Sequence, residues 1–544
     1  MGEKKRARSI TVWRKKRIEK NLRKDRSYKR LIYNRFIVTL SLVLLQIAGS
    51  LLLSFYFYND GGRLALLIID GIALITLLYI FNNYEKPSLK IGWMIMILFL
   101  PIFGVSLYIA FGRGRPTRKM HKKIAAAKAE NIKAVSKNEE AEQRVLAMGR
   151  RTKICQYLST YAGYPAYDDG TLDYFSSGKE MFAAMLEETE KAEKFILAEY
   201  FIIESGKMWD PFLELILKKA NAGVQVRIIF DNVGSLFTLP PKYELYLESL
   251  HPNIKAINFN PVTPVFTTRM NNRDHRKFLI IDGKVAFTGG INLADEYIGE
   301  KLRFGYWKDT GLKITGKAVN CFTFMFFNIW NAFHEAKDAL SDFLYYPEKS
   351  ENDGGTAETN KKNEGFFMQP YDDSPLDRES VGETVYLDLI YGAKERLWIF
   401  TPYLILDDFL RTAITGAAKR GVDVRIVTPK IPDKKTVFRL TRANYAPLMQ
   451  AGVKIYEYTP GFIHAKSMLS DDMAVVGTIN LDYRSLYLHF EDAVYFAGCD
   501  AVSALKRDCE ETFALSKLME PSDVKRSFIG RLVDSVLRVF ETLL

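Results

Sequence analysis

Two short segments of the chain place a histidine two residues before a lysine and seven residues before an aspartate. The residues are His275, Lys277 and Asp282 in the first segment and His464, Lys466 and Asp471 in the second. Residues two apart in a strand share a face, so each imidazole would lie beside a fixed positive charge, where it can act as nucleophile, acid or base. Asp282-Gly283 has the composition of a turn, and the opposite parity of the aspartates favours a structural role for them.

One such segment would carry little weight, but the chain has only six histidines and two of them occur in this pattern. Each segment is also followed by a similar glycine turn and an asparagine, Gly289 to Asn292 and Gly477 to Asn480. Backbone amides in such turns and amide side chains suit phosphate oxygens. We therefore predict Asn292, Asn480 and Thr478 as phosphate-binding residues.

A histidine that works as nucleophile, acid or base needs a carboxylate on its other ring nitrogen. Alignment of Trp307 to Thr310 with His489 to Asp492 supplies one carboxylate in each half of the chain. We predict that Asp309 orients His275 and that Glu491 orients His464. An ordinary salt bridge is the alternative for either carboxylate.

The elements that would position these residues occur twice. Short apolar runs alternate with amphipathic helices, as in Phe195 to Ile203, Asp210 to Ala220 and Val224 to Asp231, and the same order returns from Leu397 to Val427. The segment GVQVRI at 223–228 is matched by GVDVRI at 421–426. The pattern predicts a duplicated α/β fold of two pseudo-symmetric lobes.

The first 35 residues hold 15 Lys/Arg and 3 Asp/Glu, which accounts for the whole net charge of +12 and leaves the rest of the chain neutral. A basic tail before apolar sequence indicates membrane topology or anionic lipid more than a nucleic-acid groove. Three apolar stretches follow, at Phe36 to Tyr58, Leu64 to Phe81 and Ile91 to Phe111, each near the length of a membrane-spanning helix. We therefore expect a multi-pass protein of the cell membrane.

The orientation in the membrane depends on how many of these stretches cross it. Arg113 to Lys123 contains six Lys/Arg and no acid, so this segment and the tail both favour the cytoplasm, which requires an even number of crossings. Three stretches make an odd number. Either one of them is re-entrant or interfacial, with Pro101 and Gly104 weakening the third, or the lobes face outward. We favour lobes at the cytoplasmic face.

The sequence therefore predicts six segments. They are a basic cytoplasmic tail (1–35), a transmembrane region of two or three apolar helices (36–112), a connecting helix (113–150), a first lobe (151–345), a flexible linker (346–366), and a second lobe with a C-terminal amphipathic helix (367–544). The last helix has Phe528, Leu532 and Val536 on one face, which fits either core docking or contact with lipid. The four cysteines are scattered and indicate neither a disulfide framework nor a zinc site.

At these residues the sequence resembles the phospholipase D superfamily, whose signature is a doubled HKD motif, and within it the bacterial cardiolipin synthases. The segments that carry the resemblance are HRKFLIIDGKVAFTGGINLADEYIG at 275–299, YWKDT at 306–310, GTINLDYRSLYLHFE at 477–491 and LPIFGVSLYIAFGR at 100–113. His489 stands where the family pattern has asparagine, and a third apolar stretch stands where two are usual.

The resemblance implies that both motifs, with catalytic residues His275, Lys277, Asp282, His464, Lys466 and Asp471, line one active site. One histidine would form a phosphohistidine and the other would act as general acid and base. We assign the first role to His275 and the second to His464. The near-symmetry of the two motifs makes these roles exchangeable. Two phosphatidylglycerol molecules would give cardiolipin and glycerol, with no metal or other cofactor.

The motifs leave other functions open. A hydrolytic phospholipase D or a phosphatidylserine-forming transferase would use the same residues. A nuclease of the superfamily is disfavoured because the catalytic part is neutral, whereas a nucleic-acid groove needs basic surface. A membrane scaffold with a degenerate fold is the weakest alternative, since both His-Lys pairs and both asparagines are present.

Overall fold

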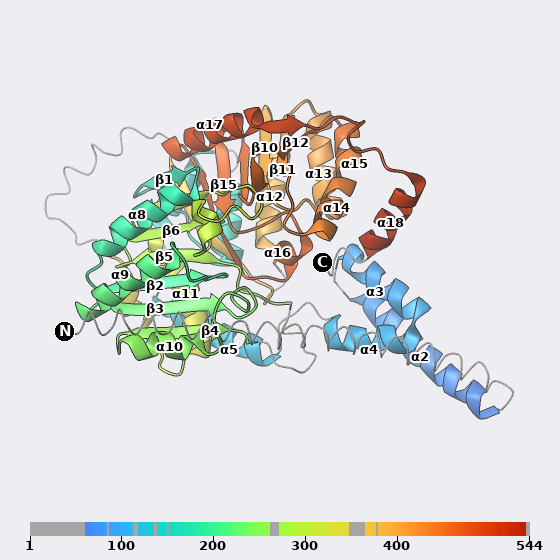
Figure 1. Cartoon of the computed structure of the whole chain (residues 1–544), viewed down its shortest axis with the longest axis horizontal. Coiled ribbons are helices and arrows are strands. Elements are labelled where there is room, and N and C mark those ends of the chain that lie inside the picture. Colours follow the sequence, from blue (N-terminus) through green and yellow to red (C-terminus); the bar gives the residue numbers. More distant parts are fainter. Residues whose placement is uncertain are drawn as a thin grey trace. The chain divides into compact units, whose positions relative to one another are not determined.

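A computed structural model describes residues 60–83, 86–112, 118–134, 139–149, 152–261, 271–346, 365–376 and 379–539. The chain forms two compact units, residues 1–113 and 114–544 (Figure 1). The predicted basic tail, the first apolar stretch and most of the predicted linker lie outside the described residues.

The first unit contains helices α2 (Asp60–Asn82), α3 (Pro87–Phe99) and α4 (Pro101–Phe111). In the described part of the chain, only α2 is long and apolar enough to cross a membrane, over Leu64–Asn82. The third apolar stretch, Ile91 to Phe111, is not one continuous helix. The helix breaks at Leu100, whose φ of −137° leaves the helical region, because a residue before proline is driven toward extended backbone.

The two halves of the third stretch pack against each other instead. A Cβ added at Gly104 would lie 2.7 Å from the Cα of Ile97, so the helix backbones approach closely at this glycine. Trp93 of α3 and Tyr108 of α4 make an edge contact with ring centroids 5.5 Å apart. At 13 and 11 residues, neither helix reaches the roughly 20 residues needed to span hydrocarbon.

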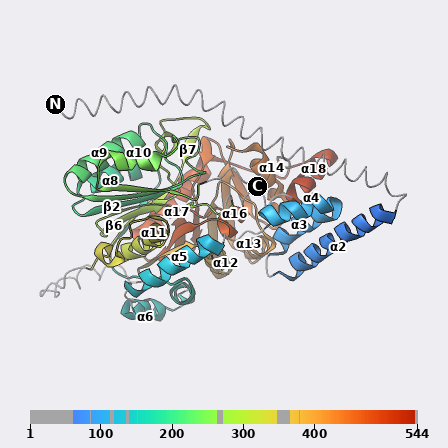
Figure 2. The same ribbon diagram turned by 90° about the horizontal axis from the view of Figure 1, so that it is seen from below.

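The first lobe is built on a seven-stranded sheet of order β1-β8-β6-β5-β2-β3-β4. Its strands are β1 (Leu172–Phe175), β2 (Phe195–Tyr200), β3 (Gln225–Asp231), β4 (Ile254–Phe259), β5 (Lys277–Ile281), β6 (Val285–Gly289) and β8 (Gly311–Thr315). β2, β3 and β4 are parallel and the other pairings are antiparallel. Helices α8 (Gly178–Glu190), α9 (Trp209–Asn221) and α10 (Tyr243–Leu250) cover one face, and α11 (Val319–Phe333), almost entirely buried, covers the other (Figure 2).

The second lobe repeats this plan with an eight-stranded sheet of order β17-β12-β11-β10-β14-β15-β16-β9. Its strands are β9 (Phe367–Asp373), β10 (Arg396–Phe400), β11 (Asp423–Pro429), β12 (Lys454–Tyr458), β14 (Ser467–Ser470), β15 (Met473–Gly477), β16 (Glu491–Ala497) and β17 (Ser516–Leu518). Its helices are α12 (Val381–Gly392), α13 (Asp408–Lys419), α14 (Lys435–Ala443), α15 (Tyr445–Gln450), α16 (Tyr483–Tyr487), α17 (Asp500–Ala514) and α18 (Phe528–Val539). The mixed α/β fold with two equivalent lobes is as predicted.

The second unit also contains several shorter elements. They are α5 (Arg118–Asn131), α6 (Glu139–Ala147), α7 (Lys153–Tyr157), a π-helix (Leu158–Ala162), and three 3₁₀ turns (Ile132–Ala134, Asp295–Ile298 and Leu340–Phe343). Within the predicted connecting helix (113–150), the described residues form two α-helices, α5 and α6, and one 3₁₀ turn. Asn131 at the end of α5 donates a side-chain hydrogen bond to Asn328 of α11, 3.0 Å away, so α5 packs on the first lobe.

Three backbone pairings join the lobes within the described ranges. Tyr167 of the first lobe and Met368 of the second form an antiparallel bridge. The short strands β7 (Tyr306–Lys308) of the first lobe and β13 (Gly461–Ile463) of the second pair in parallel. On the other side of the pseudo-symmetric arrangement, Asp274 of the first lobe forms an isolated parallel bridge with Phe490 of the second. One hydrophobic cluster also continues through both lobes, so they fold as a single unit.

The motif aspartates hold the lobes' central strands in place. Asp282, with φ of 53°, accepts hydrogen bonds of 2.8 Å from the backbone amides of 193, 194 and 195, at the start of β2. Asp471, with φ of 55°, accepts three of 3.0 Å from the amides of 394, 395 and 396, at the start of β10. Both lie at the end of their strand away from the histidine. Their inclusion among the catalytic residues is therefore wrong.

Replacement of Asp282 by Ala is expected to lower the free energy of unfolding by about 3 kcal/mol or more, because three buried or half-buried amides lose a charged acceptor. Urea unfolding of the detergent-solubilised protein measures it. Asp173→Ala, on the exposed side of β1, is the matched control and should change little. An Asp282→Ala protein as stable as this control would contradict the structural role.

Candidate active site

The four histidine and lysine side chains of the motifs are buried where the two lobes meet. His275 lies just before β5, and Lys277 is the first residue of that strand. His464 and Lys466 lie between β13 and β14. The motifs therefore lead into their strands. They do not form the strand faces that the two-residue spacing predicted. The burial nevertheless concentrates two imidazoles and two ammonium groups in one region.

Each histidine is bound by a carboxylate from the opposite lobe. His275 Nδ1 lies 2.8 and 2.9 Å from the two carboxylate oxygens of Glu491, and His464 Nδ1 lies 2.6 Å from Asp309 Oδ2. The predicted pairing of Asp309 with His275 and of Glu491 with His464 is wrong, although the two carboxylates are the ones that contact the histidines. A proton on Nδ1 directed to the carboxylate leaves the Nε2 lone pair free for chemistry.

The backbone explains the exchange of partners. The amide of His275 donates to the carbonyl of Phe490 at 2.9 Å, so the next residue, Glu491, lies beside the imidazole. In the second half, the amide of His464 donates to the carbonyl of Lys308 at 2.7 Å, which places Asp309 in the same relation. These two lobe-joining pairings thus align each histidine with the carboxylate of the other lobe.

The two lysines make the same local contact in both motifs. Lys277 Nζ donates to the carbonyl of His275, and Lys466 Nζ donates to the carbonyl of His464. Burial lowers the pKa of Lys277 to about 8 and, with the added repulsion from Lys277, lowers the pKa of Lys466 to about 7. Both ammonium groups are therefore held at the edge of deprotonation near neutral pH.

Both imidazoles have a lowered pKa, which favours their neutral form. Burial, opposed by Glu491, lowers the pKa of His275 well below its usual range, and burial together with Lys466 lowers the pKa of His464 to about 4. Burial alone would raise the pKa of each partner carboxyl, but the imidazoles hold the pKa of Asp309 and of Glu491 below the ordinary value. Neutral imidazoles with ionised partners are in the state that a nucleophile or base requires.

The electrostatic effects also connect the two motifs. The charge of Lys277 lowers the pKa of His464 and of Lys466, which belong to the other lobe. The charge of Asp309 raises the pKa of Lys277. The two halves therefore act on one common space, where an anion would be attracted by both ammonium groups.

The three predicted phosphate-binding residues have different surroundings. Asn292 accepts a hydrogen bond of 2.9 Å from the amide of Ile202 and donates one of 2.6 Å to the hydroxyl of Tyr297. The buried Oδ1 of Asn480 has no hydrogen-bond partner among the described residues. The hydroxyl of Thr478 exchanges hydrogen bonds with the backbone of Asp492, so we assign Thr478 to holding β16 in place.

Aromatic rings that the sequence analysis did not select form the walls of the site. Phe201 contacts His275 edge-on with ring centroids 4.9 Å apart, while Trp307 and Tyr297 lie 5.3 and 5.5 Å from His464. Asp492 is a further buried carboxyl, which binds the hydroxyl of Thr288, and burial raises its pKa to about 7. Asp492 directly follows Glu491, and Trp307 lies two residues before Asp309. This nearness to predicted residues is the only sequence signal for either of them.

Two glycines of the turns after the motifs are required by close backbone approach. A Cβ on Gly290 would lie 2.0 Å from Asp309 Oδ1, and a Cβ on Gly477 would lie 2.3 Å from the carbonyl oxygen of Asp492. Glycine therefore allows each carboxylate-bearing segment to reach its position. This is a firmer role for the glycines than phosphate binding.

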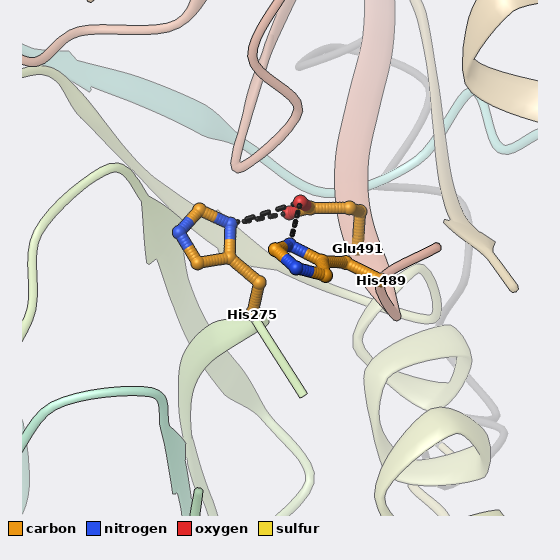
Figure 3. A group of neighbouring side chains, drawn as sticks. All are labelled: His275, His489 and Glu491. Atoms are coloured by element: carbon orange, nitrogen blue, oxygen red, sulfur yellow. Dashed lines mark hydrogen bonds and ion pairs between the residues drawn. The ribbon is translucent and has the colours of Figure 1, made fainter. Parts of the chain in front are cut away.

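His489, which departs from the family pattern, lies beside the first histidine (Figure 3). Its Nδ1 is 3.6 Å from Glu491 Oε1, and its ring centroid is 5.5 Å from that of His275. Nine-tenths of its side chain is buried, and neither ring nitrogen has a hydrogen-bond partner among the described residues. Ligand atoms of His275, His489 and Glu491 lie within 4.8 Å of one another, so these three residues could hold a metal ion.

The arrangement supports transfer of a phosphoryl-centred group. One neutral imidazole can attack phosphorus while the other exchanges a proton with the departing or arriving oxygen. Two ammonium groups offset the negative charge that develops on the non-bridging oxygens. All of the required groups come from the protein chain.

Comparison with known proteins identifies related sequences over most of the chain. A family model described as cardiolipin synthase, PLD-like domain matches residues 185–302 and 386–512, and a model described as phospholipase D-nuclease N-terminal matches 68–113. A cardiolipin synthase of Geobacillus kaustophilus is 32% identical over 92% of this chain and 98% of its own length. An uncharacterized protein of Streptococcus mutans is 40% identical over 86% of this chain and 99% of its own length.

A solved structure shows the same fold at low sequence identity. The phosphatidylserine synthase of Haemophilus influenzae superposes with a TM-score of 0.51 at 16% identity, covering 72% of this chain and 99% of that one. The two-lobed architecture is therefore shared with an enzyme of known structure.

Replacement of Gly290 by Ala is expected to lower the free energy of unfolding by about 1–3 kcal/mol, because the added methyl group overlaps the Asp309 carboxylate. Gly416→Ala is the control, since a Cβ there meets only the end of Arg420 at 3.7 Å within α13, and it should be neutral or stabilising. Denaturant unfolding compares the two. Equal stability of both variants would show that the close approach at Gly290 carries no constraint.

Proposed function

The chain belongs to the cardiolipin synthase family of phospholipase D-like proteins, and from this membership we propose that it joins two phosphatidylglycerol molecules into cardiolipin and releases glycerol. As a cardiolipin synthase, it is a phosphatidyltransferase. The observation that carries the proposed chemistry is the pair of cross-lobe contacts between imidazole and carboxylate, His275 with Glu491 and His464 with Asp309.

In the first step, His275 Nε2 attacks the phosphorus of one phosphatidylglycerol. His464 enters this step protonated on Nε2, because the negative charge of the bound phosphodiester raises the pKa of its imidazole. The bond between phosphorus and the glycerol headgroup oxygen breaks, and His464 Nε2 gives that oxygen its proton. The products are glycerol and a phosphatidyl group bound to His275. In the second step, His464 takes the proton from a hydroxyl of another phosphatidylglycerol, whose oxygen attacks the phosphorus. The bond to His275 breaks and cardiolipin leaves.

The remaining groups support this cycle. Glu491 and Asp309 hold the Nδ1 protons, which fixes both tautomers and stabilises positive charge on the rings. Lys277 and Lys466 would neutralise the non-bridging oxygens, with the Asn292 and Asn480 amides as further candidates. The phosphodiester brings a negative charge that raises the pKa of the nearby imidazole, so binding of substrate would make His464 a more effective acid.

The N-terminal unit fits a lipid substrate. The apolar helix α2 can serve as one membrane crossing. With the first apolar stretch, Phe36 to Tyr58, as a second crossing and α3 and α4 as an interfacial hairpin, the number of crossings is even. The basic tail and the basic segment from Arg113 to Lys123 then both lie in the cytoplasm, in accord with the preference of Lys and Arg for that side. The lobes would work at the cytoplasmic surface, close to both lipid substrates.

Purified protein in vesicles containing phosphatidylglycerol is expected to form cardiolipin and glycerol in equal amounts, as measured by lipid chromatography and an enzymatic glycerol assay. His275→Ala and His464→Ala should each reduce turnover by at least about 10³-fold, because each removes a ring nitrogen that takes part in bond making or proton transfer.

The products decide between the related reactions. Phosphatidic acid as the only lipid product would indicate a hydrolase, and phosphatidylserine formed in the presence of serine would indicate a different acceptor. An acid-quenched sample should carry the phosphatidyl group on the peptide with His275. The same group found on His464 would reverse the two roles, and full activity of either alanine variant would overturn the mechanism.

The pH dependence should reveal the two buried lysines. Each is charged below its pKa, of about 7 for Lys466 and about 8 for Lys277, and loses that charge as the pH rises through these values. Affinity for the anionic substrate is therefore expected to fall in this window, with kcat/KM declining more than kcat because bound phosphodiester favours the charged lysines. Lys466→Arg, which stays charged, should move the decline to higher pH. An unchanged decline in this variant would assign it to another group.

A further inference from the structure

Helix α18 packs on the second lobe through polar contacts. Arg439 of α14 binds Asp534 at 2.5 Å and the carbonyl of Gly530 at 3.0 Å, and Arg538 donates to the carbonyl of Ala443 at 2.8 Å. Asp534 is only 7% exposed. The polar side of the helix is therefore the one that faces the protein.

The apolar side of α18 faces away from the protein. The exposed fractions are 75% for Phe528, 72% for Ile529, 58% for Leu532, 39% for Val533 and 53% for Val536. A surface helix of a soluble protein has the opposite arrangement, with its apolar stripe on the core. The sequence left open whether this helix docks on the core or contacts something outside the protein. Its exposed apolar side favours an external contact. A continuous apolar surface of this kind marks a binding site for another apolar phase or partner.

Basic side chains line a cavity on the side of α18 that faces the second lobe. This cavity of about 790 Å³ lies between α18 and α15, and its charged lining residues are Arg442, Lys525, Arg526, Arg531, Arg538 and one acid, Asp534. Asp534 is already paired with Arg439 and Arg526. Arg442 is paired with the buried Glu457. The excess of positive charge next to the exposed hydrocarbon therefore comes from Lys525, Arg531 and Arg538.

We propose that α18 and the basic cavity beneath it form a docking site for the surface of an anionic phospholipid bilayer. Phe528, Ile529, Leu532 and Val536 enter the boundary between headgroups and acyl chains, and the arginines and Lys525 bind lipid phosphates. This combination of an apolar face and basic flanks is what an interfacial helix requires. The inference deepens the proposed function and rests on it, since it gives the lobes a second contact with the membrane that holds their substrate.

The charge distinguishes this occupant from two others. A second copy of the chain would bring the same basic groups against these, at a cost in repulsion. The N-terminal segment of this chain carries 15 Lys/Arg in its first 35 residues and is repelled for the same reason. An anionic lipid surface complements both the charge and the apolar face.

The test uses the full chain reconstituted in phosphatidylcholine vesicles with roughly one-third phosphatidylglycerol. Cys499 is replaced by Ser, because Cys155, Cys321 and Cys509 are buried and unreactive. An environment-sensitive dye is then attached through Val536→Cys or, as the matched control, through Leu245→Cys on the 54% exposed position of α10. Lipids with a quencher on the acyl chain report the depth of each dye.

We expect several-fold stronger quenching at position 536 than at position 245. Lys525→Glu with Arg531→Glu should reduce quenching at 536 several-fold, and so should vesicles of phosphatidylcholine alone. Equal quenching at both positions would overturn the proposal. Cross-linking between two chains through position 536 without quenching would assign the face to a second copy, and protection of the dye from both quencher and cross-linker would assign it to another part of the same chain.

The quenching is measured independently of turnover. The His464→Ala protein should show the same quenching as the active protein, because α18 does not contribute to the catalytic groups. Quenching without formation of cardiolipin would therefore refute the proposed reaction and leave the membrane contact standing. Cardiolipin formation without quenching at 536 would refute the membrane contact of α18 and leave the proposed reaction standing.

Discussion

Two short backbone pairings between the lobes determine the geometry of the active site. The amide of His275 binds the carbonyl of Phe490, and the amide of His464 binds the carbonyl of Lys308. Each pairing places the next residue of the partner segment, Glu491 or Asp309, on the Nδ1 atom of a histidine. Neither lobe could orient its own histidine in this way. The catalytic unit therefore needs both lobes in contact, which explains why a single core runs through them.

The same burial that fixes the geometry sets the protonation states. Two imidazoles, two ammonium groups and two carboxylates are removed from water together, and the charged members offset one another. Burial keeps the imidazoles neutral and brings the pKa of Lys277 and Lys466 to about 8 and 7. A phosphodiester entering this space adds a negative charge that stabilises the charged form of both lysines. The site is thus suited to an anion, and binding and activation of the acid are coupled.

The contacts with lipid are separate from this chemistry. Within its described residues, the N-terminal unit supplies one helix of membrane-spanning length and a hairpin of two shorter helices, which meet at Gly104. At the other end of the chain, α18 turns its charged side inward to Arg439 and its apolar side outward. Proline and glycine thus determine the first feature, and a buried ion pair determines the second. Both arise from local chemistry that the doubled motif does not require.

The sequence by itself determined the duplicated α/β fold, the two histidines and lysines, and the identity of both orienting carboxylates, because spacing and repetition are properties of the chain. It did not determine which carboxylate serves which histidine. Asp309 is nearer to His275 in sequence, yet strand pairing between the lobes places it on His464. The orientation of α18 was likewise decided by tertiary packing, since an amphipathic pattern shows that a face is apolar and not what it contacts.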